Sequence, residues 1–182
     1  AEADPAFDID GVDAAHKLAL LTALAFGCEG DFGAVHVEGI RAISPLDIRF
    51  AEELGYRIKL LGLASRTERG IEQRVHPSMV PMGAPIAHVE DVFNAVVADG
   101  DFVDTTLFQG RGAGAGPTAS AVVADLIDIA RGHKSPTFAV PATALTRFKA
   151  APMAGHVGWY YVRLMGVDKP GGFAEIAGAL HD

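Results

Sequence analysis

The sequence of 182 residues has one cysteine, no long apolar run and no excess of positive charge. The single cysteine, Cys28, cannot form a disulfide within the chain, so no disulfide framework is expected. The longest apolar run, residues 18–27, has about half of the ~20 residues that a membrane-spanning helix needs, so we interpret it as a buried helix. The N-terminus lacks the charged, apolar and small-residue order of a signal peptide. We therefore expect a cytoplasmic protein with no membrane role.

Basic residues are outnumbered by acidic ones, with 15 Lys and Arg against 23 Asp and Glu and a formal net charge of −8. The Lys and Arg residues are dispersed, so the chain has no basic stripe that would neutralise a phosphate backbone, and nucleic acid is not an expected partner. Apolar residues make up 49% of the chain and charged residues 21%, which is typical of globular proteins. We expect one large domain, or one domain plus a piece of another.

A helix is predicted over residues 12–26. Leu20, Leu21 and Leu24 recur at helical spacing within the apolar run, and Gly27 follows as a plausible end of the helix. The helix is therefore expected to be buried along its leucines.

Proline, glycine and alternating apolar residues delimit the other predicted elements. Ser44 as N-cap and Pro45 at the first helical position predict a helix that ends at Gly55. A hairpin is also predicted within 88–110, turning at Asp99 and Gly100. The remaining predicted elements are a strand at 34–40, a hairpin of 56–64 with 70–80, a helix over 117–132, a strand at 159–166 and the start of a helix at 173–180. Strands dominate the middle of the chain.

A glycine-rich loop, GRGAGAG at residues 110–116, precedes the predicted helix that begins at Pro117. A glycine loop at a helix N-terminus can bind an anion, because unpaired amides and the helix dipole point outward there. The loop does not fit G-x-G-x-x-G in either register, since position 115 is Ala and position 117 is Pro. A self-contained dinucleotide site is therefore disfavoured.

Asp13 and Lys17 are four residues apart near the start of the first predicted helix. From spacing alone, such a pair is most often a solvated ion pair that contributes a few tenths of a kcal/mol. A proton-transfer site on one helix face is the alternative.

Two histidine and carboxylate pairs, His36 with Glu38 and His88 with Glu90, have the alternating spacing of one strand face. Neither has a third ligand, and the chain has no zinc motif. We therefore expect no metal site, and we interpret Cys28 as a small buried hydrophobe.

Five segments together resemble homoserine dehydrogenase, in that family's order: residues 1–17, 53–64, 74–81, 110–126 and 160–180. The resemblance covers nearly the whole chain. It implies an α+β fold, with a mostly antiparallel sheet, helices packed on one face and an incomplete ACT-like βα segment.

The resemblance also implies a division of the chain. Residues 1–133 correspond to the substrate and catalytic domain, incomplete at its start, and within it 110–132 would return to a nucleotide-binding domain that this chain lacks. Residues 134–156 form a linker, and residues 157–182 form a truncated ACT-like domain.

Homoserine dehydrogenases interconvert L-aspartate 4-semialdehyde and L-homoserine with NADP or NAD, in threonine and methionine biosynthesis. The resemblance implies that Lys17 is the proton donor or relay and that Asp13 orients it. Glu2 and Asp8 match acids that hold the ammonium group or the hydroxyl of the substrate. In the reverse reaction Lys17 accepts a proton, which requires partial deprotonation, and burial would favour it.

Gly112, Ala113 and Gly114 match a loop that lies against the nicotinamide end of the cofactor. A tight helix entry that only glycine permits is an equally weighted interpretation. Many family members have proline where this chain has Arg111, which could reach a phosphate or point to solvent.

The family resemblance implies a homodimer or higher homo-oligomer, with threonine as a possible regulator of the intact enzyme. We expect the chain alone to be inactive. A non-catalytic dimerisation core or an amino-acid-sensing fragment is the alternative function.

Overall fold

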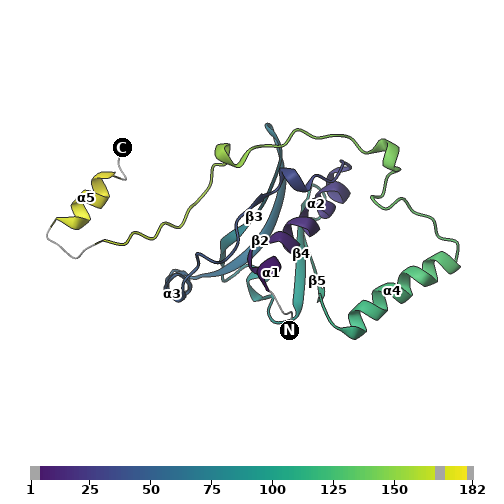
Figure 1. Cartoon of the computed structure of the whole chain (residues 1–182), viewed down its shortest axis with the longest axis horizontal. Coiled ribbons are helices and arrows are strands. Elements are labelled where there is room, and N and C mark those ends of the chain that lie inside the picture. The colour runs from purple at the N-terminus through teal and green to yellow at the C-terminus, as the bar shows by residue number, and fades with distance from the viewer. Residues whose placement is uncertain (1–4, 167–170, 180–182) are drawn as a thin grey trace.

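The computed structural model describes residues 5–166 and 171–179 (Figure 1). Its helices are α1 (Ala6–Ile9), α2 (Val12–Phe26), α3 (Pro45–Glu53), α4 (Ala115–Ala130) and α5 (Gly172–Ala179). Its strands are β1 (His36–Val37), β2 (Tyr56–Thr67), β3 (Gly70–Pro81), β4 (Phe93–Gly100) and β5 (Asp104–Arg111). Short 3-10 helices are η1 (Phe32–Ala34), η2 (Pro85–His88), η3 (Ala142–Ala144) and η4 (Met153–Gly155). None of the described helices has the length and apolar character needed to cross a membrane.

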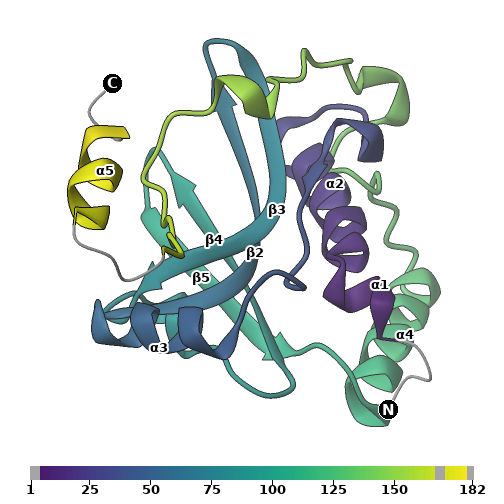
Figure 2. The ribbon, with the colours of Figure 1, turned by 60° about the vertical axis from the view of Figure 1, so that its left-hand side comes forward.

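The described strands form two sheets, where one had been predicted (Figure 2). In the first sheet β3 is the middle strand, antiparallel to β2 and parallel to the two-residue β1. The second sheet is the antiparallel β4–β5 hairpin. The predicted α+β class and the predominance of antiparallel pairing are confirmed, whereas the strand predicted at 34–40 is reduced to β1.

The turn between β4 and β5 differs from the prediction. Asp99 and Gly100 remain paired with the opposite strand, and the chain reverses over residues 101–103. Asp104 closes the turn with a φ of 54°, a left-handed conformation that Asp tolerates better than most residues. The hydroxyl of Thr105 donates to Oδ1 of Asp99 at 2.6 Å, which stabilises pairing beyond the predicted Asp-Gly turn.

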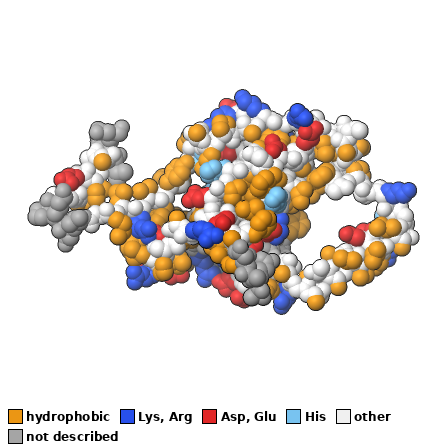
Figure 3. Space-filling model, viewed as in Figure 1, with side chains coloured by type: hydrophobic (Ala, Val, Ile, Leu, Met, Phe, Trp, Pro, Cys, Tyr) orange, Lys and Arg blue, Asp and Glu red, His pale blue; other side chains and the backbone are white. Residues whose placement is uncertain are grey.

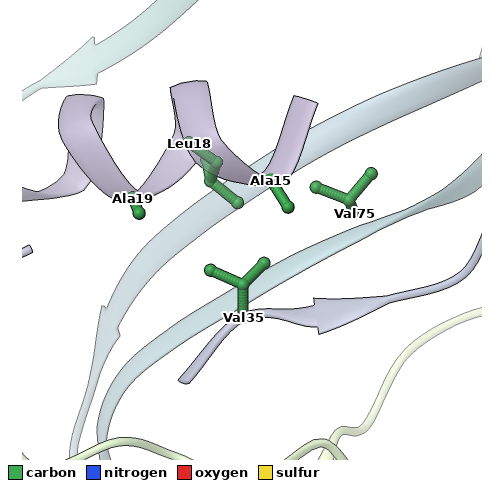
Figure 4. Packing of buried hydrophobic residues seen from close by; sticks show 5 residues of the cluster. All are labelled: Ala15, Leu18, Ala19, Val35 and Val75. Carbon is green, nitrogen blue, oxygen red and sulfur yellow. The ribbon is translucent and has the colours of Figure 1, made fainter. Parts of the chain in front are cut away.

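Helix α2 packs against β2 and β3, with the core beneath it (Figure 4). The buried cluster consists of Ala15, Leu18, Ala19, Val35 and Val75. The predicted helix is confirmed, but the prediction that its leucines are buried is wrong, because Leu20, Leu21 and Leu24 are at least 40% exposed. Small residues on the opposite face allow the helix to approach the sheet closely. A Cβ at Gly62 of β2 would lie only 3.4 Å from Leu18.

The ends of α2 and α3 follow the predicted signals. Gly27 ends α2 with a φ of 62°, the left-handed conformation that favours glycine. At the start of α3 the backbone amide of Ser44 donates to Asp47, and the amide of Asp47 donates to the hydroxyl of Ser44. This capping box, followed by Pro45, fixes where α3 begins.

Residues 146–151 run from the end of α2, where the amide of Glu29 donates to the carbonyl of Thr146, to the start of β3. Ile71 donates its amide to the carbonyl of Lys149 at 2.9 Å, and Ala151 donates to the carbonyl of Ile71 at 2.9 Å. Figure 2 shows this segment continuing past β3 toward α3. Within the range predicted as a linker, residues 146–151 thus add backbone bonds at the edge of the sheet.

The segment that follows is tied to the N-terminus of α3. Asp47, which is 4% exposed, accepts hydrogen bonds from the Tyr161 hydroxyl at 3.0 Å and from Arg163 Nη1 at 2.7 Å. The strand predicted at 159–166 is not formed, because no described neighbour pairs with its backbone. The ACT-like βα prediction is therefore corrected in its strand, while the predicted helix is present as α5.

Helix α4 leaves an apolar stripe uncovered. No residue of α4 is buried, and Val122, Leu126 and Ile129 are more than half exposed. Hydrophobic side chains follow α4 along the right-hand arm in Figure 3. The helix predicted over 117–132 is thus present, but no described element packs against it.

Candidate functional site

The Asp13 and Lys17 side chains meet on the first two turns of α2. Nζ of Lys17 donates to Oδ2 of Asp13 at 2.5 Å, as the i, i+4 spacing on one helix face allows. The Lys17 side chain is 67% exposed, and the Asp13 side chain is 38% exposed. The ammonium group is therefore reachable from solvent and already held by a carboxylate that orients it.

The Lys17 side chain is largely exposed among the described residues. With two thirds of the side chain exposed, the ion pair contributes at most about 1 kcal/mol to stability. Nζ of Lys17 is therefore accessible to a group bound beside α2.

Asp8 lies on α1, one turn before α2 begins. Its side chain is exposed, and the structure shows no ion pair for its carboxylate among the residues it describes. The joint between the helices is Gly11, which has a φ of 77° and lies against Val75. The acid predicted at Glu2 lies outside the described residues.

Aromatic stacking also holds α1 against α2. The His16 ring stacks on Phe32 with centroids 4.0 Å apart, and it stacks on Phe7 of α1 at 6.0 Å. His16 directly precedes Lys17 in the chain. The stack therefore ties the helix that carries Asp8 to the turn of α2 that carries Lys17.

An ion pair that the sequence did not predict joins Asp10 to Arg41. Nε and Nη2 of Arg41 donate to the two carboxylate oxygens of Asp10, with Nη2 at 3.0 Å. The hydrogen bond from Arg41 lowers the pKa of Asp10 below its usual value, so Asp10 is charged at neutral pH. Because these residues are 31 positions apart, local spacing contains no signal for their contact.

The predicted cofactor loop has features of both interpretations. Gly114 has a φ of 120°, which favours glycine, whereas a Cβ at Gly112 would meet only the end of the exposed Asn94 side chain, which can move aside. The loop is also fully exposed, and no side chain caps the start of α4. Its backbone is thus accessible to a bound group, which fits a neighbour of a nicotinamide cofactor. Arg111 lies over the Phe93 ring at 5.3 Å.

The two histidine and carboxylate pairs, His36 with Glu38 and His88 with Glu90, do not form a ligand set in the part of the chain that the structure describes. Nε2 of His88 donates to the carbonyl of Met82 at 2.7 Å, and Glu90 pairs with Arg57. The pKa of Glu90 is lowered by that hydrogen bond. Within the described ranges no group of three or more His, Cys, Asp or Glu residues could hold a metal ion.

Comparison with known proteins gives consistent matches. Residues 1–127 match the homoserine dehydrogenase family. A homoserine dehydrogenase of Neisseria gonorrhoeae is 48% identical over 186 residues, covering 99% of this chain and 43% of the relative. One from Pseudomonas aeruginosa is 45% identical over 188 residues, covering 100% of this chain and 43% of the relative. The chain thus spans less than half the length of these relatives.

Solved structures agree with the sequence matches. A homoserine dehydrogenase from Thiobacillus denitrificans has a TM-score of 0.75 and 53% identity, covering 80% of this chain and 35% of that one. A hyperthermophilic archaeal homoserine dehydrogenase in complex with NADPH has a TM-score of 0.59 and 27% identity, covering 73% of this chain and 37% of that one. On the family match and these relatives, the chain belongs to the homoserine dehydrogenase family.

Proposed function

We propose that this chain supplies the proton-transfer and substrate-holding part of an enzyme that interconverts L-aspartate 4-semialdehyde and L-homoserine. The observation that carries the proposal is the Lys17–Asp13 pair on α2, with Nζ 2.5 Å from the carboxylate, in a chain of the homoserine dehydrogenase family. The preceding helix α1 carries Asp8.

Lys17 has the chemistry that reduction of an aldehyde requires. The nicotinamide cofactor, when bound, supplies the hydride. Lys17 stabilises the negative charge that develops on the aldehyde oxygen and donates the proton that completes the hydroxyl. Asp13 orients the ammonium group toward the substrate. In the reverse direction Lys17 accepts the hydroxyl proton, directly or through water.

Asp8 and Glu2, the two acids that precede Gly11 in the chain, suit the amino-acid part of the substrate. Asp8 has an exposed carboxylate on α1, and a carboxylate forms charge-assisted hydrogen bonds with an ammonium group. Glu2 precedes it in the chain. We assign both acids to binding the substrate's ammonium group or hydroxyl.

The cofactor is NADP or NAD, with Gly112, Ala113 and Gly114 as its neighbours. Their exposed backbone supports this assignment, and one related structure was solved in complex with NADPH. The exposed apolar stripe of α4 supports packing against a nucleotide-binding domain. A homodimer, regulation by threonine and a cytoplasmic location remain predictions.

The test is made in a full-length homoserine dehydrogenase that contains this sequence. Lys17→Ala should lower kcat by roughly 10²–10⁴-fold, the usual contribution of a positioned general acid, and Asp13→Ala should lower it less. Stability should change by at most about 1 kcal/mol, because the pair is exposed. Steady-state kinetics and the thermal midpoint are measured on the same samples.

The matched control is Arg147→Ala. Arg147 forms an exposed ion pair with Glu29, with Nε 3.2 Å from the carboxylate, beyond the opposite end of α2. Its loss should leave kcat unchanged. Near-normal turnover of Lys17→Ala at saturating substrate and cofactor would show that another group moves the proton.

A further inference from the structure

The segment after β1 is in direct backbone contact with the end of α1. The amide of Ile40 donates to the carbonyl of Ile9 at 2.9 Å. A Cβ on Gly39 would overlap the Ile9 carbonyl and lie 2.7 Å from Cα of Asp10, so no side chain fits there. Residues 39–41 and the end of α1 therefore form one closely packed unit.

Arg41 adds a side-chain clamp to this contact. Two nitrogens of its guanidinium group engage the two oxygens of Asp10, which is the bidentate geometry that fixes relative orientation as well as distance. The side chains are 61% and 42% exposed, so little stability is expected from the pair. Its effect should lie in geometry rather than in the free energy of unfolding.

Asp10 is placed where geometry affects the candidate site. Its backbone amide donates to the carbonyl of Ala6 at 2.8 Å, and the amide of Gly11, the joint to α2, donates to the carbonyl of Asp8 at 3.0 Å. Asp8 lies two residues before the clamp, and Asp13 lies three residues after it. A turn about this joint would move Asp8 relative to Lys17.

We propose that Arg41 is a positioning residue that acts through Asp10 to hold Asp8 of α1 in register with Lys17. This inference rests on the proposed function. Because α1 carries the acid assigned to the substrate's ammonium group, loss of the clamp should weaken binding of the amino acid more than it slows the chemical step.

The experiment uses the same full-length enzyme. Arg41→Gln, which cannot form the charged bidentate pair, should raise the KM for homoserine by about tenfold or more, since small misplacements of a binding group are costly. The kcat value and the KM for the nicotinamide cofactor should stay within about threefold of the wild type, because Lys17 and the cofactor loop are untouched. Arg147→Ala is again the control for loss of an exposed arginine.

Asp10→Asn provides the second variant, because it keeps the side-chain volume and removes only the charge. It should reproduce the rise in KM, and the double variant should show no more than the effect of either single change, as expected for two residues that act as one unit. Arg41→Lys, with a single nitrogen, should restore the KM only in part.

The outcomes separate this inference from the proposed function. If Lys17→Ala loses turnover while Arg41→Gln and Asp10→Asn keep the control's KM, the positioning role is refuted and the proposed function stands. The inference is also wrong if the increases in KM caused by Arg41→Gln and Asp10→Asn add in the double variant. It is likewise wrong if the KM values for homoserine and for the cofactor rise together while the thermal midpoint falls, because Arg41 then acts on the fold. Normal turnover of Lys17→Ala overturns the proposed function itself, and this inference with it.

Discussion

Replacing Leu18 by alanine tests how α2 is held on the sheet. Leu18 is the largest side chain of its buried cluster and is 6% exposed. Two other members, Ala15 and Ala19, are too small to fill the space, and Gly62 of β2 has no side chain to offer. The cavity left by Leu18→Ala should therefore persist. The free energy of unfolding should fall by about 3–4 kcal/mol, within the usual range for buried Leu→Ala changes.

Urea denaturation of the 182-residue chain measures this loss, and the thermal midpoint should fall by roughly 6–16 °C for a protein of this size. Leu20→Ala is the matched control, because Leu20 lies on the same helix and is 57% exposed. It should change the unfolding free energy by less than about 1 kcal/mol. Unfolding of Leu18→Ala and of Leu20→Ala is measured at two protein concentrations, since association would stabilise the folded chain. Equal losses for the two variants would refute the packing of α2 through Leu18.

Two further predictions follow from perturbed groups. Hydrogen bonds from Ser44, assisted by Tyr161 and Arg163, lower the pKa of Asp47 below its ordinary 3.8. The charged Asp47 carboxylate therefore stabilises the fold above pH 3.8, and this stabilisation is lost as the pH falls through the lowered pKa. Asp47→Asn should remove this part of the acid dependence of urea unfolding between about pH 5 and pH 3, and identical acid dependence in both proteins would contradict it. Burial raises the pKa of the Cys28 thiol. A thiol reagent at pH ~8 should therefore modify the native chain at least about tenfold more slowly than the urea-unfolded chain. Equal rates would show that Cys28 is accessible in the native chain.

The elements that could be predicted from the sequence are those with local signals. Gly27 ends α2, Ser44 and Pro45 begin α3, and β2 and β3 form a hairpin, as the sequence pattern indicated. Each signal acts within a few residues, through a capping hydrogen bond or a backbone conformation that one residue type favours. Such preferences are independent of where the rest of the chain lies.

The features that could not be predicted depend on distant partners. Leucines and alanines both recur along α2, and packing against β2 and β3 buries the face with the alanines and Leu18. The segment at 159–166 has a strand-like composition but no described neighbour to pair with. The carboxylate of Asp47 is bound by two donors more than 110 positions away, which no local pattern could indicate.

Three aspartates around the α1–α2 joint differ in their partners in the structure. Asp8, Asp10 and Asp13 lie within six residues of one another. Asp10 is engaged by both guanidinium nitrogens of Arg41, and Asp13 by the ammonium group of Lys17. Asp8 alone of the three has no ion pair among the described residues, so its carboxylate is the one available to a substrate ammonium group. This division agrees with the roles proposed for these acids, and it explains why a clamp on Asp10 would be felt at Asp8.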